Sequence, residues 1–162
     1  MKYLFLLLFT ITSIPSIGQE LIQNSDTGYY ESQGVIELNE LNKDEIFTGA
    51  LEWIALKYNS ANDVIQLKDK EAGKIIVKGN FSSSLFGKQG FLKHTLRLEF
   101  KDNRFRYTYT DFSYYSSGSG DMPFEGTMFS KKKIISTTQS QVENSIKDMT
   151  NFIKNQGKDS DW

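Results

Sequence analysis

The chain has 162 residues, with 38% hydrophobic and 24% charged positions, 19 Lys and Arg against 20 Asp and Glu, and a net charge of −1. A chain of this length most simply forms one domain, and a near-neutral charge lacks the basic footprint of a nucleic-acid-binding protein. It contains no cysteine, which excludes structural disulfides, thiolate chemistry and lipid attachment at a cysteine.

Residues 1–18 have the pattern of a secretory signal peptide. Lys2 gives a positive start, residues 3–9 form an unbroken apolar run, and we expect cleavage after Gly18 or Gln19. The run is shorter than the roughly 20 apolar residues that span a membrane. We therefore expect an exported protein, periplasmic or secreted, that is not a lipoprotein and has no transmembrane segment after cleavage. Export without disulfides is more typical of a bacterial envelope than of a eukaryotic secretory route.

The next segments predict a lead-in, a strand and a helix. Residues 20–27 have the composition of a flexible lead-in, and the alternation over residues 28–38 predicts a first strand. Asn42 is a favoured N-cap, and Glu45 stands where a capping box needs it. The apolar stripe of this helix ends near Tyr58 and consists of Ile46, Phe47, Ala50, Leu51, Trp53 and Ile54.

Four more strands follow. Residues 64–68 and 74–81 alternate around a tight connection, and residues 95–101 and 104–110 flank the dipeptide at positions 102 and 103. That dipeptide is Asp-Asn, and both residue types tolerate the left-handed conformations of a two-residue hairpin turn. Beyond a Ser/Gly-rich loop at residues 114–121, residues 123–129 suit an edge strand.

The hairpin turn fixes the register of the two central strands. One face then carries the pairs Phe100–Phe105, Leu98–Tyr107 and Leu96–Tyr109, and the other carries Glu99–Arg106 and Thr95–Thr110. An apolar face opposite a polar one is typical of a half-buried antiparallel sheet.

A second helix is predicted near the C-terminus. Ser140 is a suitable N-cap with Glu143 at the capping-box position, and Gly157 is a suitable C-cap. The apolar stripe consists of Val142, Ile146, Met149 and Ile153. Two helices and one sheet, each with one apolar side, predict an α+β two-layer sandwich over residues 28–157. We expect an antiparallel sheet of about five strands with two helices on one face.

Four segments of the chain resemble a family of secreted bacterial proteins known as domain of unknown function 4468, with a TATA-binding-protein-like (TBP-like) fold. They are Lys43–Tyr58, Asp63–Ile76, His94–Leu96 and Arg104–Phe112. The resemblance implies a single repeat of this fold and no particular activity. Nucleic-acid binding is not expected, because DNA-binding members use two tandem repeats with apolar wedges, and fold alone does not imply function.

The main functional hypothesis is a non-catalytic module that binds an envelope protein or polymer. The helix-free side of the sheet, here called the open face, should show Lys74, Ile76, Lys78, Thr95, Arg97, Glu99, Arg106, Thr108 and Thr110. We single out Lys78, Arg97, Glu99 and Arg106 on this mixed, cation-leaning platform. We add Leu85 and Phe86, two apolar residues in a polar segment, where exposure indicates contact with a partner.

Two alternative functions, a hydrolase and a carbohydrate-binding protein, involve other residues. His94, the only histidine, lies opposite Asp111 in the predicted register, and such a pair can orient an imidazole as a general base in a hydrolase. Tyr114 and Tyr115 can bind a carbohydrate if their rings are exposed and roughly coplanar. The sequence contains no cofactor motif and no cluster of metal ligands, so no cofactor is expected.

Overall fold

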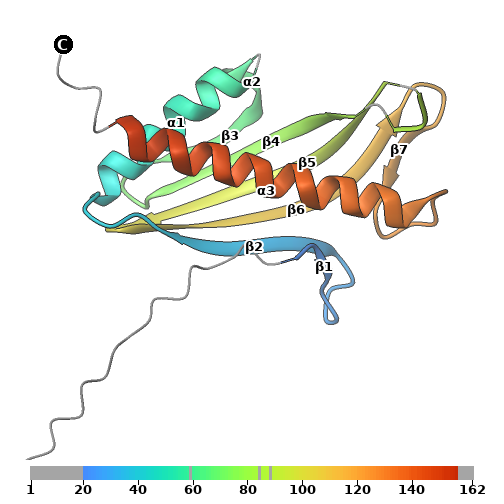
Figure 1. The fold of residues 1–162 in the computed structure, drawn as a ribbon, viewed down its shortest axis with the longest axis horizontal. Coiled ribbons are helices and arrows are strands. Elements are labelled where there is room, and N and C mark those ends of the chain that lie inside the picture. The colour runs from blue at the N-terminus through green and yellow to red at the C-terminus, as the bar shows by residue number, and fades with distance from the viewer. Residues whose placement is uncertain (1–19, 59, 84, 88, 157–162) are drawn as a thin grey trace, which may run out of the picture.

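The computed structural model describes residues 20–156 except residues 59, 84 and 88 (Figure 1). The predicted signal peptide and Gly157 lie outside the described residues. The two long helices are α1 (Lys43–Lys57) and α3 (Lys131–Gln156), and the short ones are α2 (Ala61–Val64) and a 3₁₀ turn (Leu85–Gly87). The strands are β1 (Ile22–Gln23), β2 (Tyr30–Glu37), β3 (Ile65–Asp69), β4 (Lys74–Ser83), β5 (Gly90–Lys101), β6 (Arg104–Ser116) and β7 (Gly120–Pro123).

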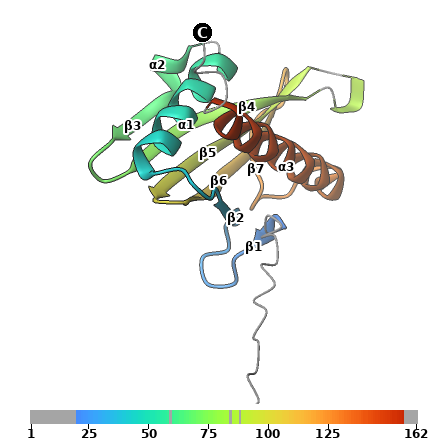
Figure 2. The ribbon, with the colours of Figure 1, turned by 60° about the vertical axis from the view of Figure 1, so that its left-hand side comes forward.

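The strands form one antiparallel sheet in the order β1-β2-β6-β5-β4-β3, and β7 pairs with β6. Helices α1 and α3 lie side by side on the same face of this sheet, as both views show (Figures 1 and 2). The predicted α+β two-layer architecture is confirmed. Within the described residues the sheet has seven strands rather than about five, because the short strands β1 and β7 extend it. No helix in this part of the chain is long and apolar enough to cross a membrane.

The central hairpin has the predicted register. Leu98 lies opposite Tyr107, and Phe100 opposite Phe105. The turn is tight because Asn103 adopts a positive φ of 64°, a conformation that asparagine tolerates better than most residues. The apolar members of these pairs are all buried beneath the helices.

The lead-in predicted at residues 20–27 is wrong. Ile22 and Gln23 pair with the start of β2. Leu21 is buried against the core, and its backbone N–H donates to the side chain of Gln139 on α3. A strand of two residues is too short to show an alternating pattern, so the sequence offered no periodic signal for it.

The C-terminal helix begins earlier than predicted. Helix α3 starts at Lys131, and Ser140 lies inside it, where its hydroxyl donates to the carbonyl of Ser136 at 3.2 Å. Such internal bonds let serine and threonine sit within a helix although their propensity is modest. The edge strand predicted over residues 123–129 is also wrong, since β7 ends at Pro123, where the missing N–H breaks no ladder bond.

Helix α1 meets α3 at Gly49. A Cβ built at this buried position would lie 2.6 Å from Oε1 of Gln156 and 3.2 Å from Cγ1 of Ile153, both on α3. On its other side α1 contacts the sheet, where Phe47 packs edge-on against Phe100 with ring centroids 5.3 Å apart. The missing side chain therefore lets the two helices approach closely enough to share one sheet face.

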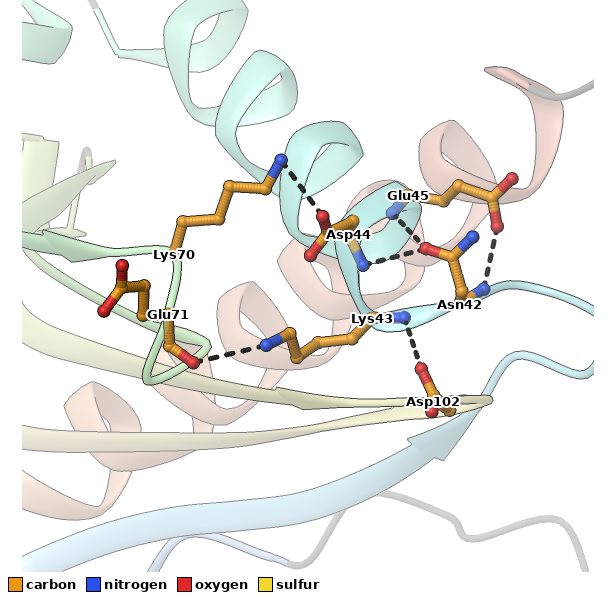
Figure 3. Close-up of polar contacts among 7 residues, drawn as sticks. All are labelled: Asn42, Lys43, Asp44, Glu45, Lys70, Glu71 and Asp102. Carbon is orange, nitrogen blue, oxygen red and sulfur yellow. Dashed lines mark hydrogen bonds and ion pairs between the residues drawn. The ribbon is translucent and has the colours of Figure 1, made fainter.

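The N-terminus of α1 has the predicted capping box (Figure 3). Asn42 Oδ1 accepts the backbone N–H groups of Asp44 at 2.9 Å and Glu45 at 3.0 Å. Glu45 Oε2 accepts the backbone N–H of Asn42 at 2.8 Å. Three N–H groups at the start of the helix are thereby satisfied.

The same helix end is joined to two hairpin turns (Figure 3). The backbone N–H of Lys43 donates to Asp102 Oδ1 at 2.8 Å in the β5–β6 turn. Its side-chain Nζ donates to the carbonyl of Glu71 at 3.2 Å in the β3–β4 turn, and Lys70 forms an ion pair with Asp44 at 3.2 Å. These bonds hold one end of the central strands in a fixed position relative to α1.

Candidate binding surface

The open face carries the side chains that the register predicted. Alternate residues of β4, β5 and β6 point away from the helices, so Ile76 lies beside Arg97, and Arg97 beside Thr108. Lys78 lies beside Thr95 in the same way. The strands thus position a row of long cationic side chains among short hydroxyl-bearing ones.

Glu99 is the centre of an ion-pair cluster on this face. Its Oε2 accepts from Arg106 at 2.7 Å and 2.9 Å through two guanidinium nitrogens, and its Oε1 lies 4.0 Å from Lys74 Nζ. The Glu99 side chain is 30% exposed. Its charge is therefore balanced by Arg106 and Lys74 within the protein.

Lys78 and Arg97, unlike Arg106 and Lys74, have no acidic residue paired with them in the described part of the chain. Both are exposed, and neither has an ion-pair partner among the residues that the structure describes. They are diagonal neighbours, because Lys78 pairs with Thr95 and Arg97 with Ile76 on adjacent strands. Two like charges at this spacing repel each other, so an anion bound between them would relieve that repulsion.

Two hollows lie on the open face. One, of about 310 Å³, is at the hairpin-turn end and is lined by Glu99, Lys101, Arg104 and Arg106. The other, of about 410 Å³, is lined by Lys78, Lys93, Thr95 and Asp111. Both hollows have cationic side chains in their walls.

The second hollow lies at a β-bulge in β6. The β5–β6 register shifts between Lys93 and Thr95, and Asp111 takes a positive φ of 55°. An extra residue of this kind is left out of the ladder and redirects the strand. Sequence reasoning missed Lys93 as part of this face because it began β5 at Thr95, although Lys93 has the same parity as Arg97.

The bulge also separates His94 from Asp111, so the pair predicted for a hydrolase does not form. His94 points to the helix-covered side, where its imidazole is 3% exposed, while Asp111 is exposed to solvent. The imidazole Nδ1 lies 3.3 Å from the carbonyl of Leu92, and Nε2 has no hydrogen-bond partner. Burial lowers the pKa of His94 to about 4, against a weaker opposing effect of the Leu92 bond.

Leu85, in the β4–β5 connection, is not available as part of an exposed patch. Leu85 is only 9% exposed and packs with the core, so its assignment to the binding surface is wrong. It sits in a 3₁₀ turn that folds back against the sheet, the usual position of an apolar residue in a polar segment. The side chain of Phe86 lies outside the described residues.

The pair of exposed, coplanar tyrosine rings that a carbohydrate site would need at residues 114 and 115 is not formed either. Tyr114 is 3% exposed on the helix-covered side, whereas Tyr115 pairs with Phe91 on the open side. Adjacent residues of a strand point to opposite faces, so the two tyrosine rings cannot make one surface. Lys93 Nζ lies 5.0 Å from the centroid of the Tyr115 ring and 2.8 Å from Asp121.

The fold and the open face can now be compared with known proteins. Residues 33–115 match the family model described as "Domain of unknown function (DUF4468) with TBP-like fold". The chain belongs to this family. The match confirms the resemblance noted in the sequence, and the family description names no activity.

Two solved structures show the same fold. A TBP-like protein from Parabacteroides distasonis matches with a TM-score of 0.70 and 18% identity, over 82% of this chain and 97% of that one. A DUF4468 family protein from Bacteroides ovatus matches with a TM-score of 0.52 and 11% identity, over 77% of this chain and 81% of that one. At such identities the likeness concerns the fold alone. No curated protein matches the sequence.

Proposed function

We propose that this protein is an exported, non-catalytic binding module of the bacterial envelope, and that its open face binds an envelope protein or polymer. Residues 28–157 act as one domain after removal of residues 1–18. The observation that carries the proposal is the adjacent, uncompensated pair Lys78 and Arg97, on a sheet face that no helix in the described part of the chain covers.

Electrostatics supports a binding role for these two residues rather than a structural one. Exposed cations without an ion pair contribute little to folding. Two neighbouring cations with solvated threonines around them attract an anionic group and orient it through several donors. Beside them, two hydrogen bonds hold the side chains of Glu99 and Arg106 in place on the same face.

The test uses the mature chain and the envelope fraction of the bacterium that produces it. Arg97→Glu and Lys78→Glu each replace an open-face cation by an anion. We expect either change to reduce retention of the chain on the envelope fraction at least tenfold, and we expect retention of the unchanged chain to fall as salt rises.

The matched control is Lys132→Glu, which makes the same change of charge at an exposed position of α3. It should leave retention unchanged. If the Lys132 variant loses retention as strongly as the open-face variants, net charge alone explains the binding and the proposal is wrong. Thermal unfolding of each variant verifies that the fold is intact.

A further inference from the structure

Another concave site lies on the helix-covered side, away from the open face. It has a volume of about 290 Å³, is open to solvent, and is bordered by the C-terminal end of α1, the middle of α3 and the far half of β4. We call it the helix-side cleft. Its volume is just below the range of typical small-molecule sites, which begins at about 300 Å³, so it suits only a small ligand. It belongs to no hypothesis drawn from the sequence.

The aromatic part of the cleft is built around Gly79. A Cβ at Gly79 would lie 2.4 Å from Cε1 of Tyr58, so the missing side chain gives the Tyr58 ring its place against β4. Trp53 packs edge-on against Tyr58, with centroids 6.3 Å apart. Phe81 lines the cleft as well and rests on His94, with centroids 4.2 Å apart. The rings are therefore held in place before any ligand arrives.

The polar part comes from one stripe of α3. Gln141, Asn144, Ser145 and Asp148 follow the i, i+3, i+4, i+7 spacing that places residues on one helix face, and all four line the cleft. The carboxamides of Gln141 and Asn144 make no hydrogen bond within the described part of the chain. Each offers two donors and one acceptor oxygen in a single plane.

The charges in the cleft balance each other. Asp148 Oδ2 accepts from Trp53 Nε1 at 2.8 Å and pairs with Lys57 at 2.8 Å. These contacts with Lys57 and Trp53 lower the pKa of Asp148. Burial raises the pKa of Tyr58 to about 12, so the phenol stays neutral and able to donate. A carboxylate has about four acceptor positions, which leaves Asp148 free to accept from a ligand.

We propose that the helix-side cleft binds a neutral, polyhydroxylated ring, namely a small sugar. The aromatic side chains suit the apolar C–H faces of such a ring. The unpaired carboxamides and Asp148 suit hydroxyl groups, which donate and accept at the same atom. The internal Lys57–Asp148 pair leaves no net charge for a charged ligand to neutralise.

Tryptophan fluorescence provides a direct test. The chain has two tryptophans, and the full-length Trp162→Phe variant keeps Trp53, in the cleft, as the only indole. We expect millimolar glucose, galactose, mannose or N-acetylglucosamine to give a saturable change in its emission. Asn144→Ala in the same background should weaken that binding at least fivefold.

The control is Asn155→Ala, which removes the same side chain from an exposed position of α3 outside the cleft. It should bind the sugar like the Trp162→Phe chain. The proposal is overturned if none of the four sugars gives a saturable response, if Asn144→Ala binds as well as Asn155→Ala, or if glucuronate alone binds. An open-face variant such as Arg97→Glu should retain the response, so the two proposals can fail separately.

Discussion

The two faces of the central sheet are built from the same strands, but the residues of one face stabilise the fold and those of the other are available for binding. On β5, Leu96, Leu98 and Phe100 are buried beneath the helices, while the residues between them form the open face. The buried set makes the fold by removing apolar surface from water. The open set contributes little to stability, because exposed pairs such as Glu99–Arg106 contribute at most about 1 kcal/mol.

This difference indicates which residues can serve binding rather than folding. A face whose residues are not needed for folding can change its charge and shape without loss of the structure. The open face uses that freedom at Lys78 and Arg97, where the charges are left uncompensated. The helix-covered side has a comparable region in the helix-side cleft, where polar residues of α3 lie beside its buried apolar stripe.

The largest expected effect separates the two faces directly. Leu98→Ala should reduce the free energy of unfolding by about 3 kcal/mol, because Leu98 is 0% exposed and such truncations leave a cavity that the core fills only in part. Arg97→Ala, the preceding residue on the open face, should change it by less than about 0.5 kcal/mol. Urea unfolding of both variants measures the contrast. Similar losses in the two variants would show that the faces are not energetically distinct.

The next effect concerns the one titratable group on the covered face of β5. The pKa of His94 is about 4 in the folded protein because of burial, and near 6.5 in the unfolded chain. Between these values the unfolded state binds the extra proton, so stability falls as pH falls. The contribution is fully present above pH 6.5, and about 3 kcal/mol is lost by pH 4.

The measurement is urea unfolding at intervals between pH 7.5 and pH 4. The chain has one histidine, so no second imidazole contributes to the slope. His94→Leu should flatten the pH dependence through the upper part of this window. A slope that persists unchanged in the His94→Leu variant would mean that the imidazole is solvated in the folded protein.

The sequence contained most of the information about the fold. Strict alternation around Asp102–Asn103 predicted the central register, and the capping box at Asn42 predicted the start of α1. The open-face position of Arg97 followed from that register, and that of Lys78 from the alternation over residues 74–81. These features are local, since each depends on the spacing of residues within one hairpin or one helical turn.

The features that sequence reasoning missed depend on contacts between distant segments. The bulge at Asp111 shifts the register by one residue and moves Asp111 away from the covered face on which His94 lies, and the alternation of residues in the sequence does not indicate it. Leu85 is buried because a short turn folds back onto the sheet. The helix-side cleft did leave a signal, the polar spacing of residues 141, 144, 145 and 148, but only the position of α1 shows that this stripe faces a cavity.

The smallest of the three effects tests how tightly the covered face fits around the cleft. Gly79→Ala places a methyl group 2.4 Å from a Tyr58 ring atom, and overpacking of this kind costs about 1–3 kcal/mol. In a Tyr58→Ala background the obstructing ring is gone, so the same change at Gly79 should cost less than about 0.5 kcal/mol. A double-mutant cycle by urea unfolding measures the coupling. Equal costs in the two backgrounds would show that Tyr58 does not rest against Gly79, and the aromatic part of the cleft would then lack its fixed geometry.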